Sequence, residues 1–431
     1  MDRHIYDNYV QILHSELVPA LGCTEPIAIA YAAAKATEVL GARPEHLTAH
    51  CSGNVIKNVQ GVVVPNSGGL KGIEAAAILG ALGGDAGREL EVLQDVKPEA
   101  VAETSKLLGT GYCTCRLAEG VANLYILVQA ERGSQRTAVE IVNRHTHISR
   151  IWKNDEIIYQ DETFQTVSQG ASKDLLNLRD ILSFADEVDL ADVRTVLDDQ
   201  IAMNMAISRE GLHHSYGACV GQTLLSAYGD DVKVRACAMA AAGSDARMSG
   251  CPLPVVINSG SGNQGMAASL PVIEYAKELK VEGDKLYRAL VVSNLVALHQ
   301  KRYIGSLSAY CGAVCAACGS GAAITYLYGG DYEQISKTII NTIANVGGIV
   351  CDGAKPSCAA KIASAVDAAI LAHHMSAHEK YFKSGEGLVQ EDVEKTIENL
   401  GYVGRVGMKS TDEEILKIML GEEPGGEDEK E

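Results

Sequence analysis

From about residue 166 to residue 420 the chain is a succession of Ala-rich apolar segments. Of all the features of the sequence, this pattern most limits the folds that the chain can adopt. Segments such as 189–210 and 271–279 are typical of helices, but they are too apolar for helices that lie on a surface. The 43 Gly residues, with only three Phe and one Trp, indicate a core of small side chains in which helices approach closely. We therefore predict an Ala/Gly-rich all-α domain over 166–420.

The segment from about residue 113 to residue 160 has a different pattern. Runs of β-forming residues at 124–128, 137–142 and 147–152 are separated by short polar turns, as expected for hairpins. A chain of 431 residues is also too long for one core, because single cores stop growing near ~250–300 residues. We predict a smaller α+β domain with an antiparallel sheet over 46–165.

The two ends of the chain complete this α+β organisation. Residues 1–45 contain helix-forming segments at 5–18 and 25–40, and we expect both to pack on the larger helical domain. Residues 421–431 are mostly acidic, which predicts a disordered, solvating tail.

The charge of the chain restricts its partners. A formal net charge of −18 argues against a nucleic-acid partner, because binding phosphates requires a basic face. The first residues show no basic segment followed by an apolar run, so we expect no signal peptide and a cytoplasmic location. The uncharged stretch 303–330 is long enough to span a bilayer, but its Gly, Ala, Ser and Cys content favours buried helices. We therefore expect no membrane partner.

The twelve cysteines are a second informative feature. Without an export signal they are not expected to form a disulfide framework. A group near the C-terminus stands out, namely Cys311, Cys315, Cys318, Cys351 and Cys358. Iron–sulfur clusters need thiolates from loops or helix ends, and the Gly- and Pro-containing segment 351–358 suits such a loop. Zinc is the other metal, although zinc sites favour Cys pairs two to four residues apart.

Cys23 lies apart from this group, immediately before a predicted helix that begins Thr24-Glu25-Pro26. The positive end of the helix dipole stabilises a thiolate and lowers its pKa. A reactive thiol, acting as base or nucleophile, is therefore plausible here, and a buried inert cysteine is the alternative.

A Gly-rich turn over 258–265 opens another predicted helix and presents several backbone N–H groups, as anion-binding nests do. No Walker A ending follows it, so a substrate carboxylate is the expected ligand. The residues expected to contact substrate are Asn258, Ser259, Gly260, Ser261 and Gly262, with Asn66 and Ser67 of a similar earlier turn. Among the histidines, His145 and His147 alternate on one predicted strand face and are expected to face the site.

Several of these pieces together resemble a known family. They are the segment Gly22 to Pro26, the segment Arg247 to Gly250 that leads into the 258–265 turn, the run Cys311 to Gly321, and Cys351 to Cys358. The chain resembles, over nearly its whole length, the iron–sulfur L-cysteine desulfidases, which are related to the α-chain of bacterial iron–sulfur L-serine dehydratases.

The resemblance implies a [4Fe–4S] cluster held by three cysteines, with one iron left open. Carried onto this chain, the ligands are Cys311, Cys351 and Cys358, with Cys315 and Cys318 as competitors for the first position. Cys23 takes the role of catalytic base. The serine dehydratases carry a His in a comparable Ser-rich motif that is absent here, so L-cysteine is favoured over L-serine.

The expected function is therefore a β-elimination lyase that converts L-cysteine and water to pyruvate, ammonium and sulfide. An L-serine ammonia-lyase with the same cluster is the first alternative. A non-enzymatic small-molecule or redox sensor that contains a cluster is the second. We expect a small L-amino acid as substrate and a homo-oligomer as the assembled state.

Overall fold

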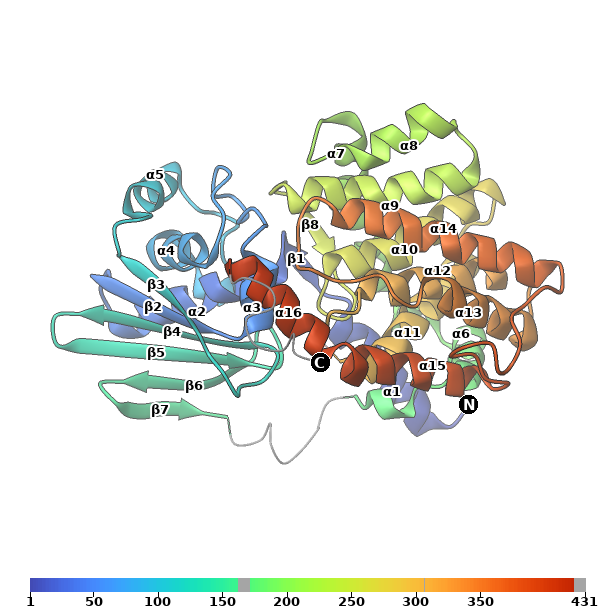
Figure 1. Cartoon of the computed structure of the whole chain (residues 1–431), viewed down its shortest axis with the longest axis horizontal. Helices are drawn as coiled ribbons and strands as arrows, with labels where there is room; N and C mark the ends of the chain where they lie inside the picture. Colours follow the sequence, from blue (N-terminus) through green and yellow to red (C-terminus); the bar gives the residue numbers. More distant parts are fainter. Residues whose placement is uncertain (162–170, 306, 422–431) are drawn as a thin grey trace, which may run out of the picture.

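The computed structural model describes residues 1–161, 171–305 and 307–421. The predicted acidic tail lies outside these residues from position 422 onward. Figure 1 shows a sheet part, built mostly from the first 160 residues, beside a larger helical part. This arrangement confirms the expected α+β class, with an Ala/Gly-rich helical part and a smaller part built on a sheet.

The sheet has the strand order β3-β2-β4-β5-β6-β7. Its strands are β2 (His46–Cys51), β3 (Cys113–Leu117), β4 (Tyr125–Arg132), β5 (Gln135–Val142), β6 (Ile148–Lys153) and β7 (Glu156–Gln160). Neighbouring strands are antiparallel, as expected, except that β2 and β3 run parallel. This difference arises because the chain between β2 and β3 forms helices, and such a crossover is what parallel pairing requires.

Helices cover one face of this sheet. They are α2 (Thr24–Leu40), α3 (Gly53–Val59), α4 (Ile73–Gly83) and α5 (Pro98–Leu107). Helix α2 contacts β4, β5 and α4, and its Ala-rich sequence is buried along most of its length. A Cβ on Gly80 would lie 2.2 Å from the Ala30 carbonyl oxygen, so α2 and α4 approach this closely only because Gly80 lacks a side chain.

The N-terminal helices pack in different places. Helix α1 (Arg3–Glu16) lies on the helical part, where Tyr9 donates a hydrogen bond to the Leu175 carbonyl at 2.9 Å and packs edge-on against Phe184. Helix α2 packs on the sheet instead, because its apolar faces match those of β4, β5 and α4. Between them, β1 (Pro19–Leu21) pairs with β8 (Pro254–Val256) and joins the sheet part to the helical part.

The helical part is built around α12, which contacts α10, α11, α13 and α14. Its helices are α6 (Leu178–Glu187), α7 (Arg194–His213), α8 (Val220–Tyr228), α9 (Val232–Met248), α10 (Gly262–Glu278), α11 (Asp284–Ile304), α12 (Gly312–Leu327), α13 (Tyr332–Val346), α14 (Cys358–Ala377) and α15 (Val393–Tyr402). Short helical turns lie at Ala86–Glu91, Lys173–Leu175, Leu190–Asp192 and Val403–Gly407. Within the described ranges, no helix is long and apolar enough to cross a bilayer.

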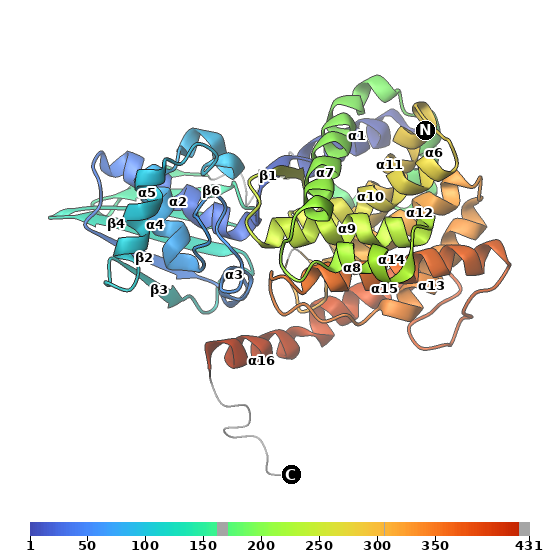
Figure 2. The same ribbon diagram turned by 90° about the horizontal axis from the view of Figure 1, so that it is seen from above.

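The last described helix, α16 (Lys409–Leu420), returns to the sheet part and packs on α3. Figures 1 and 2 both show it extending from the helical part toward α3. A Cβ on Gly53 would lie 2.3 Å from a Leu416 methyl carbon, so this contact is close. The C-terminal helix therefore bridges the two parts of the molecule.

Candidate active site

A cavity of about 680 Å³ lies where the sheet part meets the helical part. Its lining from the sheet side includes Cys23, Glu25, Asn58 and His145. Its lining from the helical side includes Arg247, Ser259, Gly260, Ser261, Lys301, Tyr310, Cys311, Cys351 and Cys358. Residues far apart in the sequence thus share one polar chamber.

Helices α2, α10, α12 and α14 all begin at this cavity, since residues of their first turns line it. Their N-cap residues are Cys23, Ser261, Cys311 and Ser357, and in the described structure none of these side chains caps its helix. Uncapped helix N-termini present free N–H groups and the positive ends of helix dipoles. The cavity is therefore suited to anionic occupants.

The pairing of β1 with β8 places Cys23 beside the Gly-rich turn. Residues of β1 and β8 are in register, and the Thr24 hydroxyl donates a hydrogen bond to the Gly260 carbonyl at 2.9 Å. Ser259 and Gly260 both have positive φ and form a tight turn that is closed by hydrogen bonds between the Asn258 and Ser261 backbones at 3.1 and 3.0 Å. The candidate base and the candidate carboxylate nest thus share one wall.

The three cysteines named as ligands face this cavity from loops and helix starts. Segments 309–311 and 349–351 pair as a short antiparallel bridge: the Cys311 N–H donates to the Ile349 carbonyl at 3.0 Å, and the Cys351 N–H donates to the Ala309 carbonyl at 2.6 Å. Cys358 is the first residue of α14 and also lines the cavity. The pairing brings the segments that carry Cys311 and Cys351 side by side.

The competing thiols of α12 point elsewhere. Cys315 and Cys318 are fully buried in the helical core, and neither lines the cavity. The Cys318 sulfur lies 3.9 Å from the Ile339 carbonyl oxygen on α13. Cys311 is therefore the α12 cysteine that is available to an occupant of the cavity.

The thiols of the cavity are close enough to influence one another. Burial, followed by the neighbouring Cys351 and Cys358, raises the pKa of Cys311 to about 12. In the described part of the chain, no three His, Cys, Asp or Glu side chains converge tightly enough for a single metal ion. The three cysteines therefore line one cavity without forming a compact site for one ion.

Cys23 is buried, and its thiol donates a hydrogen bond to a Glu25 carboxylate oxygen at 3.2 Å. Burial, followed by the charge of Glu25, raises the pKa of Cys23 well above its ordinary value, although Arg247 opposes this. The expectation of a lowered pKa was therefore wrong for the protein as described. The Glu25 backbone N–H and Arg247 favour the thiolate, but the desolvation caused by burial is the larger effect on this pKa.

Glu25 was not predicted from the sequence as a site residue. Burial alone would raise its pKa, but His145 and then the Cys23 thiol favour the carboxylate and hold the pKa at about 2. It also accepts a hydrogen bond from the Asn58 amide at 3.0 Å, and the Thr24 hydroxyl oxygen lies 3.1 Å from it. The only sequence signal for Glu25 was its position two residues after Cys23. That position indicated the start of a helix and not a residue of the site.

Arg247 is a second residue whose role the sequence did not indicate. It is buried, lines the cavity, and donates from Nε to the Gly22 carbonyl at 2.9 Å. No carboxylate pairs with it among the described residues. Gly262 allows its close approach to α10, since a Cβ there would lie 2.5 Å from the Arg247 Nε. A buried guanidinium without an acidic partner is suited to an anionic ligand.

Not all of the turn residues that were expected to contact substrate reach the cavity. Ser259, Gly260 and Ser261 line the cavity, whereas Asn258 lies behind the turn and donates to Asn294. Gly262 begins α10 and packs against Arg247.

The earlier turn is not brought to the cavity. Asn66 donates to the Leu93 carbonyl at 2.9 Å, and Ser67 donates to the Leu70 carbonyl at 3.2 Å, so both hold local structure. Neither residue is part of the cavity lining.

His145 and His147 both lie in the loop between β5 and β6, so neither is on a strand as expected. His145 lines the cavity and packs against Gly260. His147 is directed away, within 3.0 Å of the Val142 carbonyl oxygen and 3.1 Å of Asp161.

Several buried polar atoms at the cavity lack a hydrogen-bond partner within the described residues. They are Asn263 Oδ1, Gln264 Oε1 and Tyr310 Oη. Buried polar groups in native proteins are nearly always satisfied, so such atoms gathered in one chamber indicate a polar ligand.

Comparison with known proteins agrees with this site. A model of the serine dehydratase alpha chain family matches residues 87–417. A UPF0597 protein of Lachnoclostridium phytofermentans is 56% identical over 416 residues, covering 96% of this chain and 100% of the relative. UPF0597 proteins of Desulfitobacterium hafniense and Treponema denticola are 54% and 48% identical, covering 97% of this chain and 97% and 99% of their own lengths. The chain belongs to the serine dehydratase alpha chain family.

Proposed function

We propose that this protein is a [4Fe–4S]-dependent lyase that eliminates the β-substituent of a small L-amino acid, with L-cysteine as the preferred substrate. One observation carries the proposal. The Cys311, Cys351 and Cys358 thiols, the Cys23 thiol and the 259–261 turn all face one cavity at which helix N-termini converge.

The surroundings of the three thiols fit a cluster. A cube bound by three thiolates is an anionic group, and the N-termini of α12 and α14 offset that charge. Lys301 is buried in the cavity wall and has no ion-pair partner within the described ranges. Burial lowers the pKa of Lys301, and the charges of Cys315, Cys351 and Cys311 as thiolates oppose this shift.

When bound, a cluster with one iron free of protein ligands supplies a Lewis acid that polarises the β-substituent. The protein's own residues supply the rest of the chemistry. In this proposal the α-carboxylate binds at the Ser259 and Gly260 N–H groups of the turn and at the Arg247 guanidinium, because these residues line the same cavity. This arrangement fixes the substrate so that Cα lies near Cys23, which adjoins the turn.

Cys23 serves as the base that removes the Cα proton. In the described state it carries its own proton, which it donates to Glu25, so this proton must leave before the reaction. The raised pKa then becomes an advantage, because a thiolate of high pKa is a stronger base. Loss of the Cα proton and cleavage of the β-carbon–sulfur bond give aminoacrylate and sulfide. Aminoacrylate tautomerises and hydrolyses to pyruvate and ammonium.

L-serine is the second candidate substrate, because the matching family is described as the serine dehydratase alpha chain. An anaerobic assay with each amino acid distinguishes the two, with pyruvate measured for both and sulfide for L-cysteine. We expect a higher kcat/KM for L-cysteine. Turnover of L-serine alone would identify a dehydratase, and no turnover of either would favour a cluster-based sensor.

The cofactor is tested separately on the anaerobically purified protein. Iron and acid-labile sulfide analyses should each give about four per chain, with broad absorption in the visible region. Zinc in place of iron would contradict the proposed chemistry.

A further inference from the structure

The loop that carries Cys351 and Cys358 rests on the sheet part as well as on the helical part. A Cβ on Gly353, which has φ of +92°, would lie 2.2 Å from the Lys57 carbonyl oxygen on α3. A Cβ on Gly61, just after α3, would lie 3.4 Å from the Ala354 carbonyl oxygen. The loop backbone is therefore packed directly on the backbone of α3.

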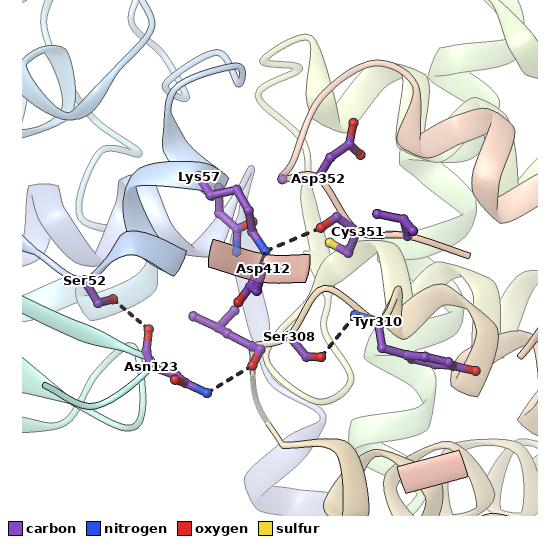
Figure 3. Close-up of polar contacts among 12 residues, drawn as sticks. Ser52, Lys57, Asn123, Ser308, Tyr310, Cys351, Asp352 and Asp412 are labelled. Atoms are coloured by element: carbon purple, nitrogen blue, oxygen red, sulfur yellow. Dashed lines mark hydrogen bonds and ion pairs between the residues drawn. The ribbon is translucent and has the colours of Figure 1, made fainter. Parts of the chain in front are cut away.

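The Lys57 side chain strengthens this contact. It is 2% exposed, and its Nζ donates a hydrogen bond to the Cys351 carbonyl oxygen at 3.4 Å. The same Nζ forms an ion pair with Asp412 of α16, as Figure 3 shows. A buried ammonium is destabilising unless it is paired and hydrogen-bonded, so Lys57 requires both partners.

Helix α16 has little other anchorage. None of its described residues is buried, and it contacts α3 and the short turn at Val403–Gly407. The Leu416 contact with Gly53, the Asp412–Lys57 ion pair and a hydrogen bond from the Gln60 amide to the Met419 carbonyl at 3.4 Å hold it on α3. Asp412 thus couples the position of α16 to the ligand loop through one shared ammonium.

The other ligand segment is fixed across the same junction. Asn123, next to β4, donates to the Leu307 carbonyl at 3.2 Å and accepts from Ser52 through its own carbonyl at 2.7 Å. The Ser308 hydroxyl accepts from the Tyr310 N–H at 3.0 Å (Figure 3). The sheet part therefore holds both backbone segments that lead to Cys311 and Cys351.

We propose that Lys57, with Asp412 as its counter-ion, is a positioning residue that holds the Cys351 ligand loop in its cluster-binding conformation. Lys57 does not line the cavity, so it acts through the Cys351 carbonyl and not on substrate. The inference rests on the ligand set of the proposed function. It adds that cluster retention depends on the docked sheet part and on α16.

The test compares Lys57→Met, Lys57→Arg and Asp412→Asn with the wild type. Glu413→Gln is the matched control, because it removes a carboxylate from the next, exposed position of the same helix. After anaerobic reconstitution, an iron chelator is added and the loss of visible absorption is timed. Bleaching should be about tenfold faster in Lys57→Met, because one hydrogen bond from a charged group is lost. Lys57→Arg should restore most of the retention, Asp412→Asn should be intermediate, and Glu413→Gln should match the wild type.

A second readout needs no cluster. In the iron-free protein, the rate of Cys351 alkylation is followed by mass spectrometry, with thermal melting as the check on folding. Lys57→Met should raise this rate about tenfold, the effect of one lost charged hydrogen bond, and Glu413→Gln should leave it unchanged.

The positioning role would be overturned if the folded Lys57→Met variant were bleached and alkylated at the same rates as the wild type. If that variant fails to fold, wild-type rates in Asp412→Asn overturn it equally. A wild-type protein that binds no iron would defeat the proposed function instead, while the alkylation rates would still test whether Lys57 holds the loop.

Discussion

At the scale of single residues, the reactive end of the cavity is controlled by the contact between Cys23 and Glu25. The carboxylate keeps its charge with a pKa of about 2 and thereby disfavours a thiolate beside it. His145, 3.8 Å from Glu25, holds the carboxylate from the other side. In the proposed mechanism, the strength of Cys23 as a base and the difficulty of forming its thiolate both follow from its raised pKa, which is caused first by burial and then by Glu25.

Cys23→Ala should keep the cluster and lose turnover. The substitution removes the base without touching the proposed ligands, so visible absorption should remain and kcat should fall by about 100-fold or more. Cys237→Ala, another buried cysteine outside the cavity lining, is the control and should stay active. A fully active Cys23→Ala enzyme would remove this residue from the mechanism.

Glu25→Gln should move the pH dependence of the reaction. Glu25 raises the pKa of Cys23 both by its charge and by accepting the thiol proton, so neutralising it lowers that pKa. Because the thiolate is the active form, the rising limb of the kcat/KM profile should shift to lower pH. The shift is measured with buffers spanning pH 6 to 10. A shift toward higher pH, or none, would contradict the assigned contact.

At the scale of elements, the site is assembled from helix starts. Helices α2, α10, α12 and α14 bring N-terminal turns to one cavity, while their later turns are packed in the core. Close packing of the Ala/Gly-rich helices makes this possible. On α12, a Cβ on Gly319 would lie 2.3 Å from the Ser293 carbonyl oxygen. Small residues therefore set how closely the elements that carry the site approach one another.

The position of a cysteine on α12 should decide whether it matters for the cluster. Cys311, at the N-cap, faces the cavity, and Cys318, two turns later, faces the core. Cys311→Ala and Cys358→Ala should therefore lose visible absorption and activity together. Cys318→Ala should keep both and lose only stability, by about 1 kcal/mol for a small buried side chain. Iron analysis and urea unfolding measure the two effects, and the reverse pattern would reassign the ligand.

At the scale of the whole molecule, the cavity belongs to neither part alone. Cys23 and Glu25 belong to the helix that packs on the sheet, whereas the proposed ligand cysteines belong to the helical part. The α16 helix crosses back to α3 (Figure 2). The cavity is therefore complete only where the two parts are in contact.

Removal of iron should destabilise the whole chain. A ligand that binds only the folded state adds its binding free energy to stability, so chelation under anaerobic conditions should lower the Tm by at least about 5 °C. Differential scanning calorimetry with and without chelator measures the change. The Cys358→Ala variant is the control, since it should show no response to the chelator. An equal Tm for loaded and iron-free protein would argue against a cluster at the junction.

Sequence patterns identified the features that depend on local structure. The Ala-rich helical span, the strand runs and the 258–265 turn follow from side-chain periodicity and from where Gly permits positive φ. The resemblance added the ligand cysteines, and the structure brings all three to one cavity. Cys23 was noticed because it precedes a helix, which is also a local signal.

Tertiary structure alone decided what depends on burial and on distant partners. Packing around α12 decides whether Cys311 or Cys318 faces the cavity. The pKa of Cys23 is set mainly by desolvation, which no local sequence pattern encodes. Glu25 and Arg247 join the site through the pairing of β1 with β8, and Lys57 reaches the ligand loop through docking of α3. Periodicity fixes which face of an element is apolar, but only the assembled fold fixes which polar groups lose water together.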